Sequence, residues 1–150
     1  MSDLNTFPNG SNYCPNFSQL LNFDFICFKE RIPAKNRKEG LITKLKFGGN
    51  QLNCYKCLSP KAGLSIASQL IASIAIAEEE LEFEHRDLHS SNILIKKTNE
   101  EFAKYCINGN PFCIKLNGYF VTIIDTTFSR SNENNEIVFN DLTRLFSHLV

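Results

Sequence analysis

A short polar stretch between two apolar runs carries the side chains best suited to chemistry in this sequence. It reads HRDLHSSN at residues 85–92 and is followed directly by the apolar run ILI. Asp87 can accept a proton from a substrate hydroxyl that lies within hydrogen-bond reach. Asn92, five residues later, can offer a neutral oxygen to a hard cation such as Mg²⁺. We therefore interpret the stretch as a candidate site for proton transfer and metal binding.

A second acidic residue follows an apolar run further along the chain. Residues 119–124, YFVTII, are typical of a buried strand, and the next residue is Asp125. A carboxylate at this point would add to the oxygen shell of a cation held by Asn92. Asp87, Asn92 and Asp125 then match the catalytic Asp, the catalytic-loop Asn and the metal-binding Asp of protein kinases. An isolated Asp–Asn pair is more often turn chemistry, but the longer pattern with its flanking helix and strand is far more specific.

The elements that must position these residues have recognisable patterns. Residues 41–47 and 92–96 are predicted strands, and Gly48-Gly49 ends the first of them. Residues 17–29 have apolar side chains on both faces and fit either a buried strand or a helix. Residues 61–81 predict a long helix, with one apolar stripe at three-to-four spacing made of Leu64, Ala67, Leu70, Ile71, Ile74 and Ala77.

The dipeptide Asn117-Gly118 is the strongest short hairpin signal in the sequence. It lies between two apolar runs, residues 112–116 and 119–124. We therefore predict that these two runs are strands that pair with each other.

Composition places the chain among soluble globular proteins. Its 150 residues are one domain's worth, with 43% apolar and 21% charged residues. Sixteen basic and sixteen acidic residues cancel, which gives no support for direct nucleic-acid binding or for binding an anionic membrane. The longest apolar-leaning run, around residues 64–77, is interrupted by Ser and Gln, and we expect it to be too short to span a bilayer. With no signal peptide at its start, we expect an intracellular protein.

Six cysteines are then expected to be reduced thiols. Cys54 and Cys57 have the spacing of a zinc knuckle, which needs a second ligand pair to close a tetrahedron. The nearest candidates, Cys106 and Cys113, are spaced too widely for that role. We therefore expect no zinc site.

Longer runs around the polar stretch resemble the haspin family of atypical serine/threonine protein kinases. LEFEHRDLHSSNILIKKT has the family's His after Asp-Leu, and IIDTTFSR resembles the family's Asp-Tyr-Thr metal motif with Thr126 in place of Tyr. LKFGG is similar to the family's hinge, and IASQLIASIAIAEEELEF to the helix before the catalytic loop. EIVFNDLTRLF at 136–146 is similar to the start of its activation segment. The resemblance runs from about Asn22 to Phe146.

This resemblance implies roles for the polar residues, with ATP and Mg²⁺ as cofactors. Asp87 would be the catalytic base, and Asn92 and Asp125 would be the metal ligands. His89 would face the phosphate or the substrate, and His85 would pack inward as a scaffold of the loop. Arg86 normally holds the activation segment through a phosphate, but haspins do not need activation-loop phosphorylation.

The resemblance also implies an adenine site at the hinge. The backbone of Lys46, Phe47 and Gly48 would bind the adenine, and Leu45 would close the rear of the pocket. Leu94 and Ile124 would pack against the adenine and the metal site.

The fold implied is α+β, a partial protein-kinase-like fold. It would comprise an N-terminal arm and N-lobe remnant at 1–45, and a hinge and partial C-lobe at 46–150. No Gly-x-Gly-x-x-Gly loop precedes Leu45, where the only glycines are Gly10 and Gly40. The chain then reads as a piece of a haspin-type kinase.

The function implied is transfer of the ATP γ-phosphoryl group to a threonine of the histone H-three tail, in nuclear chromatin. One alternative is a catalytically inactive pseudokinase or kinase fragment that acts as a binding module. Another is a small metal-dependent hydrolase that uses Asp87, Asn92 and Asp125, although no further water-activating group supports it.

Overall fold

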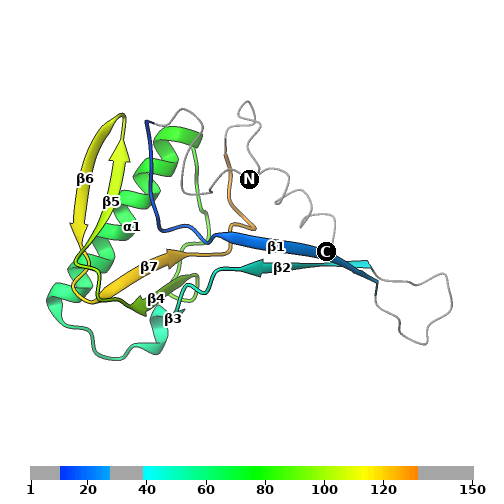
Figure 1. The fold of residues 1–150 in the computed structure, drawn as a ribbon, viewed down its shortest axis with the longest axis horizontal. Coiled ribbons are helices and arrows are strands. Elements are labelled where there is room, and N and C mark those ends of the chain that lie inside the picture. Colours follow the sequence, from blue (N-terminus) through cyan, green and yellow to red (C-terminus); the bar gives the residue numbers. More distant parts are fainter. Residues whose placement is uncertain (1–10, 28–38, 132–150) are drawn as a thin grey trace.

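The computed structural model describes residues 11–27 and 39–131. Figure 1 shows one long helix beside several strands, and a two-stranded hairpin that extends away from this body. The mixed helix and strand content agrees with the expected α+β class and is compatible with a partial kinase-like fold. The elements, in chain order, are β1 (Leu20–Cys27), β2 (Glu39–Leu45), β3 (Asn50–Gln51), a short 3₁₀ helix (Leu52–Cys54), α1 (Pro60–Leu81), β4 (Ile93–Lys97), β5 (Phe102–Ile107), β6 (Asn110–Lys115) and β7 (Tyr119–Ile123).

All strand pairs in the described sheets are antiparallel. β1 pairs with β2, β5 pairs with β6, and β4 is the central strand of a sheet with the order β3-β4-β7. In this third sheet Ile95 lies opposite Val121, and both side chains are fully buried against α1 together with Ile66. Because side chains alternate along a strand, Leu94 and Thr122 lie on the opposite face, toward the hinge.

Several predicted elements are confirmed. The apolar run at 17–29 contains a strand, β1, but residues 21–24 of it are exposed and not buried as expected. The strand predicted at 41–47 is β2. The strand predicted at 92–96 is β4. The domain division after residue 45, where β2 ends, stays a prediction. The activation-segment similarity at 136–146 lies outside the described residues.

The predicted pairing across Asn117-Gly118 is wrong. Both residues adopt positive φ angles, 48° and 87°, as a tight turn requires. The strand before them, β6, pairs with β5, and the strand after them, β7, pairs with β4. The β5–β6 hairpin instead turns at Asn108-Gly109, which has φ angles of 50° and 75°. An Asn-Gly dipeptide therefore set the backbone turn at both places, but it did not decide which strands hydrogen-bond.

Helix α1 begins and ends where its local sequence favours it. The Ser59 hydroxyl accepts the N–H of Ala62 at 3.2 Å, and Pro60 follows it in the first turn. At the other end Glu82 takes a left-handed conformation with φ 50°, and its N–H donates to Glu78 O at 2.8 Å.

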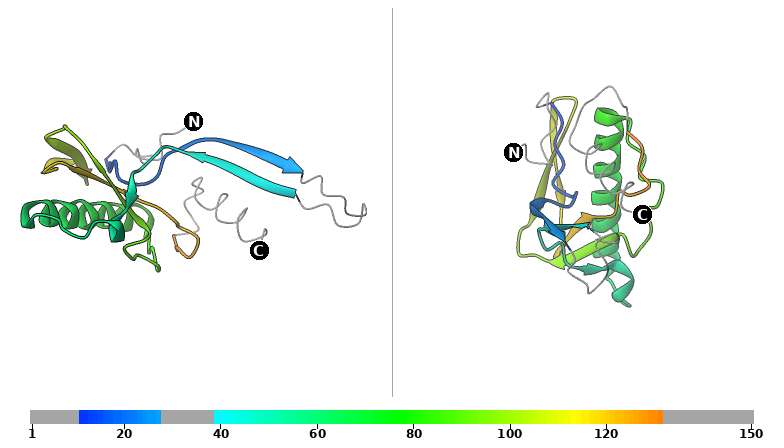
Figure 2. Two further views of the ribbon diagram at one scale, coloured as in Figure 1. Left: turned by 90° about the horizontal axis from the view of Figure 1, so that it is seen from below. Right: turned by 90° about the vertical axis from the view of Figure 1, so that its right-hand side faces the viewer.

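Helix α1 has 22 residues and is long and apolar enough to cross a membrane by length and composition alone, contrary to our expectation. One face of the helix packs against the strands (Figure 2), and 44% of its apolar window is buried there.

The face that α1 buries differs from the predicted apolar stripe. Leu64 and Ile71 from that stripe are 71% and 70% exposed. The buried face includes apolar residues such as Ile66 and Ile76, and it also contains three polar side chains. These are Ser65, Gln69 and Ser73.

The burial of Gln69 follows from the second edge of β7, which has no neighbouring strand along most of its length. Gln69 of α1 bonds that edge with both ends of its amide: Nε2 donates to Tyr119 O at 3.0 Å, and Oε1 accepts the N–H of Val121 at 3.0 Å. Asn16, which is fully buried, donates from Nδ2 to Val121 O at 2.7 Å. Its backbone carbonyl accepts the N–H of Ile123 at 2.6 Å. Two side-chain amides thus take the place of a strand on this edge.

The remaining oxygen of Asn16 joins the helix and the β5–β6 hairpin to the same point. Asn16 Oδ1 accepts the Ser73 hydroxyl at 3.0 Å and the Tyr105 hydroxyl at 2.7 Å. Burial raises the pKa of Tyr105, and it raises the pKa of the neighbouring Cys14 thiol to about 12. The groups in this part of the core are therefore neutral at physiological pH, so no buried charge opposes their packing.

We predict that Asn16→Ala lowers the free energy of unfolding by about 3 kcal/mol, because several buried hydrogen-bonding groups lose their partner at once. Urea denaturation of the chain measures this change. Asn99→Ala, at an exposed position, is the matched control and should change stability by no more than about 0.5 kcal/mol. A loss as small as that control in the Asn16 variant would contradict the prediction.

Candidate functional site

The loop of residues 85–92 connects α1 to β4 and folds around Asn92. The Asn92 side chain is 7% exposed, and its Nδ2 donates to the Asp87 carbonyl at 3.0 Å and lies 3.4 Å from Asp87 Oδ2. Its backbone N–H donates to His89 O at 2.9 Å. Since Nδ2 holds the loop together, the amide oxygen Oδ1, to which no described residue donates, is left as a ligand atom.

The end of β7 is held by the same loop. Ile124 N–H donates to Asn92 O at 3.0 Å, and Ile124 O accepts from His85 Nε2 at 3.1 Å. The next residue, Asp125, has a φ of 61°, a conformation that non-glycine residues rarely adopt. The loop therefore binds both the N–H and the carbonyl of Ile124, and in this way it positions the backbone just before Asp125. The structure in this way brings together two segments that are 32 residues apart in the sequence.

His85 has the scaffold role expected of it. It is 4% exposed, and its bond to the Ile124 carbonyl requires a proton on Nε2. Nδ1 is buried with no hydrogen-bond partner among the described residues. The ring packs edge-on against Phe83.

His89 faces the carboxylate of Asp87. His89 Nδ1 accepts the N–H of Ser91 at 3.2 Å, and His89 Nε2 lies 3.2 Å from Asn92 Nδ2. Nε2 lies 3.7 Å from Asp87 Oδ2, with the Asp87 side chain 39% and the His89 side chain 52% exposed. A substrate can therefore reach both groups from solvent.

Asn92 and Asp125 offer oxygen atoms of the kind that Mg²⁺ prefers. Asp125 Oδ1 accepts the Thr127 hydroxyl at 2.6 Å and its N–H at 3.3 Å, while Oδ2 carries no bond from a described residue. Mg²⁺ commonly takes one or two protein oxygens and completes its shell with water and phosphate. The oxygens of Asn92 and Asp125 are the right kind and number for such a Mg²⁺ site. No group of three His, Cys, Asp or Glu side chains suited to a metal occurs within residues 11–27 and 39–131.

Arg86 forms an ion pair with the carboxylate of Glu84. Its Nε donates to Glu84 Oε2 at 2.9 Å, and Arg130 lies 3.2 Å from Glu84 Oε1. The backbones of Glu84 and Arg130 also exchange two hydrogen bonds of 2.9 Å. Glu84 thereby connects the loop to the segment that follows Asp125.

The hinge residues approach the central sheet closely. A Cβ on Gly48 would lie 2.8 Å from Thr122 Cβ and 3.0 Å from Leu94 Cδ1. Gly49 has a φ of 117°, and a Cβ there would lie 2.2 Å from Ile95 O. Only glycine fits at these two positions. The chain therefore passes over β4 and β7 immediately after β2.

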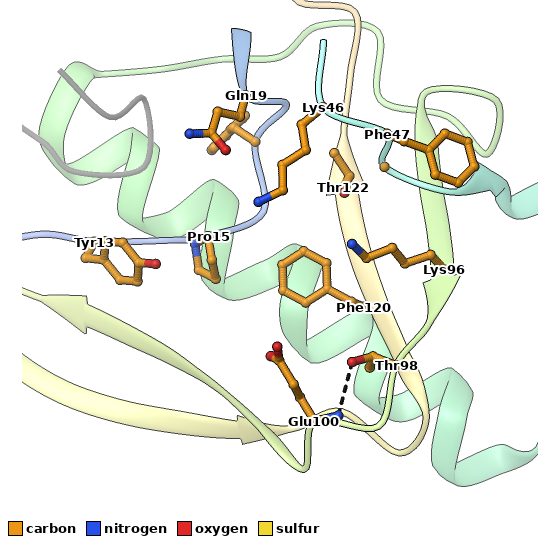
Figure 3. A pocket seen from close by; sticks show the side chains of 12 residues that line it. Tyr13, Pro15, Gln19, Lys46, Phe47, Lys96, Thr98, Glu100, Phe120 and Thr122 are labelled. Atoms are coloured by element: carbon orange, nitrogen blue, oxygen red, sulfur yellow. Dashed lines mark hydrogen bonds between the residues drawn. The ribbon is translucent and has the colours of Figure 1, made fainter. Parts of the chain in front are cut away.

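Lys46, Phe47 and Gly48 line a cavity of about 330 Å³. Figure 3 shows the side chains of Lys46, Lys96 and Glu100 around the ring of Phe120. Neither Leu94 nor Ile124, the other two predicted adenine contacts, lines this cavity, and Asp125 does not either. Leu94 and Ile124 are half-buried and lie nearer the catalytic loop. Of the predicted adenine residues, the three of the hinge line this cavity, and Leu94 and Ile124 do not.

Three residues that contribute to the site were not predicted from the sequence. Thr127 bonds the Asp125 carboxylate, Glu84 pairs with Arg86, and Asn53 Nδ2 donates to the Ser91 hydroxyl at 3.0 Å. Thr127 lies two residues after Asp125, a spacing typical of local Asp–Thr bonding. The Asn53 contact spans 38 residues and left no signal in the sequence.

Comparisons with known proteins agree with the geometry of the loop. A model of the haspin-like kinase domain matches residues 15–147. Mouse serine/threonine-protein kinase haspin is 42% identical over 105 residues, and the haspin homolog of Arabidopsis thaliana is 40% identical over 99 residues. These matches cover 69% and 66% of the chain, but only 14% and 16% of the two relatives. The haspin homolog of Drosophila melanogaster is 39% identical over 69% of the chain and 18% of its own length.

We predict that Gly49→Ala lowers the free energy of unfolding by about 2 kcal/mol or more, because the new methyl group meets the Ile95 carbonyl at an unfavourable φ. Chemical denaturation measures the loss. Gly63→Ala is the matched control, since a Cβ on Gly63 in α1 meets nothing within 4 Å. That change should stabilise the chain by up to about 1 kcal/mol. Equal stability of the Gly49 variant and the wild type would show that the hinge does not contact β4.

We predict that the pKa of Glu84 lies below its ordinary value of 4.5, because the hydrogen bond from Arg86, followed by the charge of Arg130, favours the ionised form. The stabilisation from this carboxylate is therefore present above pH 4.5 and lost as pH falls through the folded-state pKa. Side-chain carbon NMR during an acid titration measures the value. Arg86→Gln should raise it toward 4.5, and Arg130→Gln should raise it less. No change in the Arg86 variant would contradict the assigned cause.

Proposed function

Since the chain belongs to the haspin-like kinase family, we propose that it supplies the catalytic loop and metal-binding residues of an ATP-dependent protein serine/threonine kinase. The acceptor proposed is a threonine of a protein, and the family resemblance favours the tail of histone H-three in the nucleus. The observation that carries the proposal is the arrangement of Asn92. Its amide nitrogen donates to the Asp87 carbonyl, and its backbone carbonyl accepts the N–H of Ile124. One residue therefore positions both the proposed base and the end of β7 that precedes Asp125.

In the proposed reaction Asp87 accepts the proton of the substrate hydroxyl. The hydroxyl oxygen forms a bond to the γ-phosphorus of ATP, the bond from that phosphorus to the bridging oxygen breaks, and ADP leaves. Asn92 Oδ1 and Asp125 Oδ2 would hold Mg²⁺, which when bound neutralises charge on the phosphates. The exposed His89 side chain, beside Asp87, would face a phosphate oxygen or the substrate.

The hinge offers two backbone groups to an adenine. The N–H of Lys46 already donates to Gln19 O at 2.8 Å, so it does not serve the nucleotide. The Lys46 carbonyl and the Gly48 N–H carry no bond from the described residues, and an adenine can pair with one donor and one acceptor of this kind. We propose that these two groups bind it and that Leu94 and Ile124 pack on its ring.

A second candidate function is a catalytically inactive binding module. It would be the function of these 150 residues by themselves, which contain no Gly-x-Gly-x-x-Gly loop before the hinge. Such a loop and a phosphate-orienting Lys contribute orders of magnitude to the rate of phosphoryl transfer. A module of this kind would bind nucleotide or protein without turnover.

We predict that Mg²⁺ and ATP together raise the melting temperature of the chain more than ATP alone. Asp125→Asn should remove this dependence on Mg²⁺, because a ligand oxygen is replaced by an amide. Asp24→Asn, at an exposed carboxylate on β1, is the matched control and should keep it. Absence of any Mg²⁺-dependent shift in the wild-type chain would reject the proposed nucleotide site.

Phosphorylation of a threonine-containing histone-tail peptide separates the two candidate functions. Asp87→Asn should reduce the rate at least about 100-fold while leaving the thermal shift in place, since the base acts in the transfer and not in binding. Radiolabelled phosphate transfer measures the rate. Nucleotide binding without transfer in the wild-type chain would establish the binding module instead.

A further inference from the structure

The cavity beside the hinge lies on the opposite side of the hinge from the catalytic loop. Its walls are the segment before β1, the hinge residues, and the ends of β4 and β7 that are remote from Asn92 and Asp125. Phe120 and Lys96 lie opposite each other in the register of these strands, two positions from the Leu94–Thr122 pair that Gly48 contacts. Gly48 and Thr122 line this cavity, whereas Leu94, Ile124 and Asp125 do not.

Two ammonium groups enter the cavity without a carboxylate partner. Lys96 is half-buried, and its Nζ lies 5.9 Å from the centre of the Phe120 ring. The Lys46 side chain enters from the hinge (Figure 3). Neither lysine has an ion pair with a described residue. Lys46 is exposed and the ammonium of Lys96 has the Phe120 ring beside it, so both side chains can donate hydrogen bonds to an anion in the cavity.

A single carboxylate, that of Glu100, faces them across the cavity. The turn that carries it is fixed by a hydrogen bond of 3.1 Å from the Glu100 N–H to the Thr98 hydroxyl. The two lysines and the one glutamate leave the cavity with a net positive charge. The ring of Phe120 gives it an apolar wall.

We propose that this cavity is a second ligand site, which binds a small molecule that carries an anionic group on an aromatic ring. The anion lies between Lys46 and Lys96, and the ring packs beside Phe120. A volume of about 330 Å³ is within the usual range for small-molecule sites and excludes large ligands. The site shares the hinge residues with the proposed adenine site, but Leu94, Ile124 and Asp125 do not line it. It does not depend on the proposed kinase activity.

Isothermal titration of the full chain with phenyl phosphate tests the proposal, with inorganic phosphate as the probe that lacks the ring. Phenyl phosphate should bind, and Lys96→Met and Lys46→Met should each weaken its affinity about tenfold, the loss expected for one charge-assisted contact. Glu100→Gln should strengthen binding, because it removes the repelling carboxylate. Lys104→Met, at an exposed position on β5, is the matched control and should leave the affinity unchanged.

Other measurements separate this site from its neighbour. Asp125→Asn should not alter phenyl phosphate binding, and saturating Mg²⁺ and ADP should not displace the probe. Displacement would show that the cavity belongs to the nucleotide site and would overturn the proposal. So would the absence of binding at millimolar probe, or binding that survives both lysine substitutions. Equal affinity for inorganic phosphate would overturn the role of Phe120.

Discussion

One edge of β7 pairs with β4, and most of the other edge faces the interior with no strand beside it. Buried peptide groups without partners cost free energy comparable to a lost hydrogen bond, so this edge must be satisfied from within. Asn16 and Gln69 do so with side-chain amides, one from the segment before β1 and one from α1. The Gln69 amide matches the edge with one donor and one acceptor, and Asn16 adds a donor from its side chain and an acceptor from its backbone carbonyl. The position of α1, of the first described segment and of β7 is therefore decided by the same few bonds.

The catalytic loop depends on this arrangement through the end of β7. Ile123 is bonded to Asn16, and the next residue, Ile124, is bonded to Asn92 and His85. A displacement of β7 would therefore change the place of Asp125 relative to Asn92. The carboxylate and the amide oxygen proposed to bind Mg²⁺ lie on separate segments, one after β7 and one before β4. The bonds of Asn16 and Gln69 to β7 help to hold these segments in place.

The hinge is the second constraint on the central sheet. Gly48 and Gly49 lie so close to β4 and β7 that no side chain fits. This close approach divides the face of the sheet into two regions. One region leads to Leu94 and the catalytic loop, and the other holds the cavity at Lys96 and Phe120. One strand pair thus serves both the proposed nucleotide site and the proposed anion site.

The sequence by itself determined the local features. Ser59-Pro60 begins α1, the polar stretch 85–92 forms a loop before a strand, and the Asn-Gly pairs at 108–109 and 117–118 form tight turns, because these depend on neighbouring residues alone. Only the tertiary structure decided which strands pair across Asn117-Gly118, and which face of α1 is buried. Hydrophobic periodicity favoured the side of α1 with Leu64, whereas the unpaired edge of β7 required Gln69. Bonds that join residues far apart, such as Asn16 to Val121, leave no periodic signal and depend on where the chain brings two unsatisfied groups together.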